Sequence, residues 1–150
     1  MALITALTAV LMMLAIGGSV ALNTMTETTI AANHRDALQM LYAAEAGIDL
    51  SISQLRMIAD WTVAAPDPRG KTLVQGPLAN LLQVTTVDPR LNVTASVFPD
   101  PNGDPNVLVV QAVASGVGGL RRTVQAVIHG APPAPSATTR NVVTIAWRER

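Results

Sequence analysis

The chain of 150 residues has no cysteine, few aromatic residues and no excess of charge of either sign. The lack of cysteine excludes disulfides, thiolate metal sites and cysteine nucleophiles. Aromatic residues make up 3% of the chain, and 10 basic and 10 acidic residues give a net charge of zero. A nucleic acid is therefore not expected as the main ligand, because binding it requires a positive field or a stacking platform.

Charge is also missing from the N-terminal segment, Met1 to Thr26, which contains no Asp, Glu, Lys, Arg or His. A helix of this length rises roughly 39 Å, which exceeds the ~30 Å hydrocarbon core of a bilayer. We therefore predict a helix that can span a membrane. An ordinary signal peptide has a basic stretch before its apolar run, and here that stretch is missing or has been removed.

Residues 27–60 are predicted to continue the same helix in amphipathic form. No proline occurs before Pro66, so nothing forces an earlier break. Apolar residues recur at spacings of three and four and form a stripe with one acidic member, Glu45. We expect Glu45 to be held by an arginine or by backbone N–H groups of a sheet, and the alternative is a strained functional carboxylate. The stripe that should pack on a sheet consists of Leu38, Leu41, Glu45, Ile48, Ile52 and Leu55.

Gly17 and Gly18 interrupt the apolar half of the predicted helix. Each glycine costs about 1 kcal/mol relative to alanine in a helix interior. One interpretation is close packing against another helix, which small residues permit. The other is that the helix melts at this point when the segment leaves lipid.

The chain after residue 60 is predicted to form a small β domain. Residues 71–87 fit no clear pattern apart from a short helical turn at 78–82. Alternating apolar residues and turn signals predict antiparallel strands at 91–97, 107–115, 120–129 and 141–147. The expected fold is therefore α+β, with a long N-terminal helix packed on a mainly antiparallel four-stranded sheet. The expected segments are 1–26 for the apolar helix, 27–60 for its amphipathic continuation and 61–150 for the β domain.

No constellation of catalytic groups can be recognised in the sequence. We find no nucleophile with a base, no paired carboxylates and no metal-ligand set, so neither an enzyme nor a cofactor is expected. Asp100, Asn102 and Asp104 alternate as the ligands of a calcium loop do. The sixth position of that loop is Pro105 rather than glycine, and the twelfth is Gln111 rather than glutamate, which favours a plain turn.

Three stretches of the N-terminal third carry a family resemblance: residues 1–7 (MALITAL), 29–36 (TIAANHRD) and 41–48 (LYAAEAGI). Together they resemble the N-terminal region of type IV pilins, most closely the PilX-type minor-pilin family. The resemblance implies that a prepilin peptidase removes a short basic leader and that Met1 is then methylated. It also implies a subunit that is stored in the bacterial inner membrane and passed by the pilus assembly machinery into an extracellular filament.

Thr5 departs from the family pattern. Most pilins have a glutamate at this position, which pairs with the free amine of an adjacent subunit. Its loss is typical of subunits at a filament tip, although the threonine hydroxyl can still accept a weaker, neutral hydrogen bond. A bulk filament subunit, a minor tip or priming pilin or pseudopilin, and a membrane-tethered binding module therefore all stay open.

The expected partners follow from which apolar surfaces of the chain can be buried against each other and which are left exposed. If the amphipathic stripe and the sheet pack together, the apolar helix before them must be covered by lipid or by copies of itself. The expected function is a structural subunit of a helical filament made of this chain or of related pilins. The expected assembly residues are Met1, Ala2, Leu3, Ile4, Thr5, Leu7, Leu11 and Leu14.

Overall fold

The computed structural model describes residues 2–58, 60–65, 67–116, 119–131 and 139–149. The chain divides into two compact units, Met1–Asp36 and Ala37–Arg150. Helix α1, Ala2–Arg56, supplies the whole described part of the first unit and the first element of the second. The two units are described separately below.

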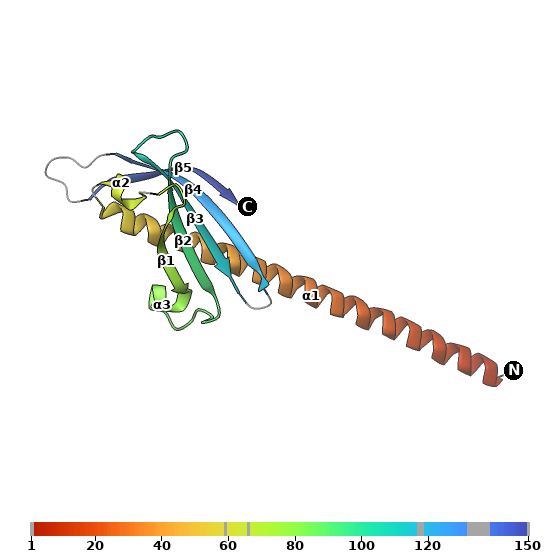
Figure 1. Ribbon diagram of the computed structural model, residues 1–150. Helices are drawn as coiled ribbons and strands as arrows, with labels where there is room; N and C mark the ends of the chain where they lie inside the picture. Colours follow the sequence, from red (N-terminus) through yellow and green to blue (C-terminus); the bar gives the residue numbers. More distant parts are fainter. Residues whose placement is uncertain (1, 59, 66, 117–118, 132–138, 150) are drawn as a thin grey trace. The chain divides into compact units, whose positions relative to one another are not determined.

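The second unit is a five-stranded antiparallel sheet with the second part of α1 packed on one face. The strands lie in sequence order, so each pairs with the next along the chain. Figure 1 shows them side by side, with α1 crossing behind them. The strands are β1 Lys71–Pro77, β2 Asn92–Pro99, β3 Val107–Ser115, β4 Arg121–Ala131 and β5 Asn141–Glu149, and two short helices are α2 Trp61–Ala64 and α3 Leu78–Leu82.

The expected α+β fold, a long N-terminal helix on an antiparallel sheet, is confirmed, but the prediction of four strands is wrong. The additional strand is β1. Its sequence does not alternate, because the pairing with β2 shifts register between Thr72 and Val74. Gly76 and Pro77 then end the strand with residues that are typical of a turn.

Small residues of α1 face the sheet. A Cβ atom built on Gly47 would lie 2.5 Å from Val93 Cγ1 and 3.3 Å from Ala112 Cβ. The helix backbone therefore approaches β2 and β3 as closely as a glycine allows. The buried face of α1 consists of Met40, Ala43, Ala44, Gly47, Ile48, Ser51, Ile52 and Leu55.

The predicted stripe overlaps this buried face only in part. Ile48, Ile52 and Leu55 lie in the core, and Leu41 packs half-buried against it. Leu38 is 37% exposed. The contact face is turned toward the alanines and Gly47 because small side chains let the helix lie closer to the strands.

Glu45 lies half-buried at the margin of the contact face. We expected an arginine or a backbone N–H group of the sheet to hold its carboxylate. Within the described residues, that carboxylate makes no hydrogen bond and no ion pair. The expected partner is therefore not found, and the side chain reaches solvent beside the core instead of entering it.

Helix α1 ends at Arg56, before the expected end near residue 60, and two other segments take up carbonyl groups at its end. Trp61 Nε1 donates a hydrogen bond to the Leu55 carbonyl oxygen at 3.1 Å. The backbone N–H of Arg140 donates to the Arg56 carbonyl oxygen at 2.9 Å. The Arg140 guanidinium lies 4.8 Å from the centroid of the Trp61 ring and donates to the Gly130 carbonyl oxygen. These contacts tie the chain just before β5 to the end of the helix.

Substituting Gly47→Ala should lower the free energy of unfolding of the second unit by about 1–3 kcal/mol, because the new methyl group would overlap Val93 in the interior of the sheet. The matched control is Gly18→Ala, whose methyl group meets nothing within 4 Å. Urea unfolding of the full chain in micelles, followed by tryptophan fluorescence, measures both. Equal midpoints for the two variants would contradict the close approach at Gly47.

Candidate functional site

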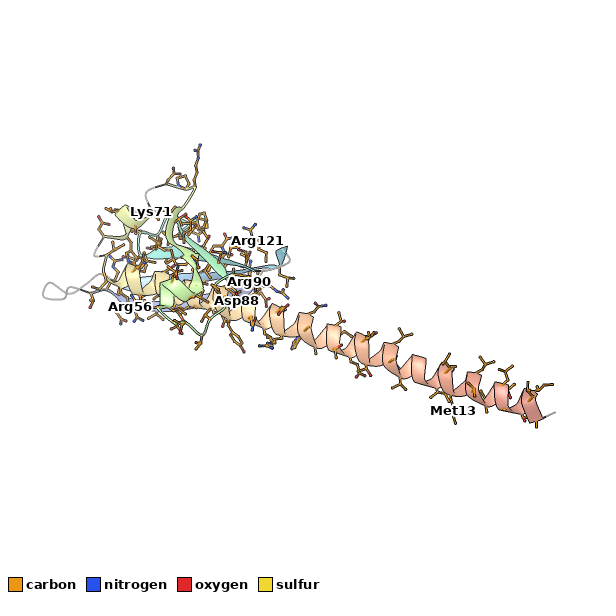
Figure 2. The ribbon with its side chains drawn as sticks, turned by 90° about the horizontal axis from the view of Figure 1, so that it is seen from below. Met13, Arg56, Lys71, Asp88, Arg90 and Arg121 are labelled. Atoms are coloured by element: carbon orange, nitrogen blue, oxygen red, sulfur yellow. The ribbon has the colours of Figure 1, made fainter. Side chains whose placement is uncertain are left out.

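The candidate site is the apolar first part of α1, residues 2–26. Its large side chains are exposed all round the helix, with Leu3 80%, Met13 76% and Leu14 72% accessible. Figure 2 shows Met13 among the side chains that surround this part of the helix. The helix is long and apolar enough to cross a membrane.

The predicted assembly residues lie on this helix, except that Met1 falls outside the described residues. The proposed methylation at Met1 therefore also lies outside them. Ile4, Leu7, Leu11 and Leu14 recur at spacings of three and four, so they share one face of the helix. Every described member of the set is exposed, namely Ala2, Leu3, Ile4, Thr5, Leu7, Leu11 and Leu14.

The hydroxyl groups of the first unit are satisfied inside the helix. Thr5 Oγ1 donates to the Ala2 carbonyl oxygen at 2.9 Å, and Ser19 Oγ donates to that of Ile16 at 2.8 Å. An unsatisfied donor costs several kcal/mol in hydrocarbon. The surface therefore needs no polar neighbour for these hydroxyl hydrogens. The same arrangement holds for Thr8, Thr24, Thr26, Thr28 and Thr29.

Thr5 can act only as a neutral acceptor toward another chain. Its hydroxyl hydrogen is engaged by the Ala2 carbonyl group, whereas lone pairs of the oxygen stay available. A threonine at this position cannot form the ion pair that a glutamate would form with an amine. It also avoids the cost of placing a carboxylate in an apolar bundle.

Gly17 and Gly18 pack against no other part of the described chain. Helix α1 is continuous through both residues, and a Cβ atom at either would meet nothing within 4 Å. Two glycines in a helix interior still cost about 1 kcal/mol each relative to alanine. What they contribute must involve contacts with other molecules or a change of conformation, so close packing and helix melting both stay predictions.

The loop between β2 and β3 uses its acidic side chains to hold its own backbone. The Asp104 N–H donates to Asp100 Oδ2 at 3.3 Å, and the Asn106 N–H donates to Asp104 Oδ1 at 2.8 Å. Asn102 Nδ2 donates to Asp100 Oδ1 at 3.3 Å. No group of three His, Cys, Asp or Glu side chains that could hold a metal ion occurs among the described residues. The geometry is that of a turn stabilised by Asx interactions.

No protein-family model, no curated protein and no solved structure matches this chain. What the protein does is therefore inferred from its apolar helix and its sheet.

Proposed function

We propose that this protein is a structural subunit of a type IV pilus-like filament, held in a membrane before assembly and joined to its neighbours through residues 2–26 of α1. The observation that carries the proposal is an exposed, uncharged helix surface whose hydroxyl donors are already satisfied. In the second unit, residues 37–56 of α1 already cover the apolar face of β2, β3 and β4. On β5, Val143, Ile145 and Trp147 stay exposed.

The size of the exposed apolar surface argues that water is not its working environment. Burying one large apolar side chain contributes about 1.5–3 kcal/mol. Summed over the large apolar side chains of residues 2–26, the free energy gained on burial reaches tens of kcal/mol. That is more than the roughly 5–15 kcal/mol that stabilises a typical domain. The residues concerned are Leu3, Ile4, Leu7, Val10, Leu11, Met12, Met13, Leu14, Ile16, Val20, Leu22 and Met25.

Lipid chains and copies of the same helix are alternative covers for this surface. Helices in such surroundings associate through van der Waals packing, which small residues such as Gly17 and Gly18 favour. Moving the subunit from a membrane into a filament then exchanges one apolar cover for another. No covalent chemistry in this chain is needed for that exchange, which agrees with the lack of catalytic groups in its sequence.

The proposed partners are copies of this chain or related pilins, the bacterial inner membrane before assembly, a prepilin peptidase and the pilus assembly machinery. The mature location is an extracellular filament. Thr5 favours a minor subunit at a tip or in a priming complex, because it lacks the carboxylate that would pair with the neighbour above.

Shearing filaments from cells that make this protein, followed by mass spectrometry and antibody labelling in the electron microscope, tests the proposal. A bulk subunit should label the filaments along their length, and a tip subunit should label one end. Detection of the chain only in the membrane fraction, with none in the filaments, would overturn the proposal.

The Gly17→Leu substitution should leave membrane insertion intact and strongly reduce filament yield, because leucine suits lipid but prevents close helix packing and stiffens the helix. Gly17→Ala is the matched control, since its small side chain meets nothing within 4 Å in this chain. Yield is measured as the amount of chain in the sheared fraction relative to the membrane fraction. Unchanged yield for Gly17→Leu would show that Gly17 takes no part in assembly.

A further inference from the structure

The face of the sheet that points away from α1 carries polar side chains beside apolar ones. On β2, Val93 and Ala95 are fully buried toward α1, whereas Thr94 and Ser96 are half-buried. Successive side chains of a strand point to opposite faces of the sheet. Thr94 and Ser96 therefore mark the outer face, and the strand pairing identifies their neighbours on it.

One polar side chain from each strand lies in a line across this outer face. Ser96 pairs with Thr72 on one side and with Gln111 on the other. Gln111 pairs with Gln125, which in turn pairs with Arg148. Directly paired residues share a face of the sheet. This line, the polar row, crosses all five strands and spans roughly 19 Å at about 4.8 Å per strand.

The two glutamines at the centre of the polar row have hydrogen-bonding capacity that the chain does not use. Both are half-buried, and within the described residues neither side-chain amide makes a hydrogen bond. Each amide offers two donors and one acceptor. In the same row, the hydroxyls of Thr72 and Ser96 lie 3.3 Å apart and are hydrogen-bonded. Gln111 and Gln125 are thus the uncharged groups of the row that are available to a ligand.

An open groove follows the polar row. A hollow of about 460 Å³ is lined by Phe98, Val109, Gln111 and Gln125. A second hollow of about 390 Å³ shares Phe98 and Gln111 with it. A third, of about 360 Å³, shares Val109 and Gln125 with the first and reaches Arg148. The three hollows therefore adjoin one another at these shared side chains, and together they are called the groove.

The groove carries few charged side chains. Phe98, Val109 and Val127 form an apolar line beside the polar row. The polar row contains no carboxylate and one cation, Arg148, at its end, while Arg121 lines the second hollow and Asp100 the first and third. A nucleic acid or another polyanion would require several cations along its path. A neutral ligand fits this arrangement better.

Aromatic residues line the groove at two places. Phe98 lies beside Gln111, and the loop at Gly70 lies against its ring, since a Cβ atom there would meet it. Trp147 lines the third hollow. The rest of the lining combines proline, short aliphatic, hydroxyl and amide side chains with Arg121, Arg148 and Asp100.

We propose that this groove binds a neutral oligosaccharide that lies along the polar row. A sugar ring carries hydroxyl groups at its edge and C–H groups on its faces. The amides of Gln111 and Gln125 donate to and accept from those hydroxyls, while the half-buried Phe98 contacts the C–H faces. The site belongs to the second unit alone, so the proposal does not depend on filament assembly.

Nuclear magnetic resonance of the full chain in phosphocholine micelles tests the proposal, because a glycoside detergent would compete through its sugar headgroup. The probes are cellohexaose, maltohexaose and chitohexaose, with the hexamer of galacturonic acid as an anionic comparison. At least one neutral hexamer should shift the side-chain amide signals of Gln111 and Gln125. No binding by any neutral hexamer tighter than about 1 mM, or tighter binding of the anionic hexamer, would overturn the proposal.

Gln111→Ala and Gln125→Ala should each weaken binding roughly fivefold to tenfold, as expected for one lost hydrogen bond. Neither change removes a hydrogen bond within the described chain, so the backbone spectrum should stay unchanged outside the groove. Gln54→Ala, an exposed glutamine on α1, is the matched control and should bind as the parent does. Equal affinity for all three variants would show that the saccharide binds elsewhere and would contradict the proposed site.

Discussion

An exposed apolar helix surface is unfavourable in water, and the function we propose depends on this constraint. Residues 2–26 of α1 carry no charge, expose their large side chains and return their hydroxyl hydrogens to the helix backbone. Lipid chains and neighbouring helices are both apolar covers for such a surface. In the function we propose, the subunit is transferred from the first cover to the second. The proposed filament subunit is the function that uses both covers.

The second unit, unlike the apolar helix, buries a hydrophobic core of its own. Its core is formed between residues 37–56 of α1 and one face of the sheet, and Gly47 sets how closely the two approach. Trp61 and the backbone N–H of Arg140 then close the end of the helix. With one face of the sheet buried in this way, the other face is free to carry a different surface. There Gln111 and Gln125 stand beside an apolar line, which is the arrangement from which we infer a saccharide site.

The sequence predicted the long helix and four of the five strands, because both rest on periodicity and on the positions of proline and glycine. The sequence did not predict the features that depend on something other than apolar periodicity. Strand β1 contains a register shift and ends in Gly76 and Pro77, so its pattern does not alternate. The face of α1 that meets the sheet is chosen by the small size of Ala43 and Gly47, which apolar periodicity registers poorly. In the sequence, Gln111 is singled out only as the twelfth position of a calcium-loop pattern, because its pairing with Gln125 depends on strand register.

Sedimentation of the purified full-length chain, before and after detergent is removed in the absence of lipid, tests the central claim most directly. In micelles the chain should sediment as one subunit with its bound detergent. After the detergent is removed, no monomer should remain, and the chain should be found in ordered assemblies or in precipitate. The reason is that other copies of the chain are then the only apolar cover for the helix. A stable, monodisperse monomer in plain buffer would contradict the account.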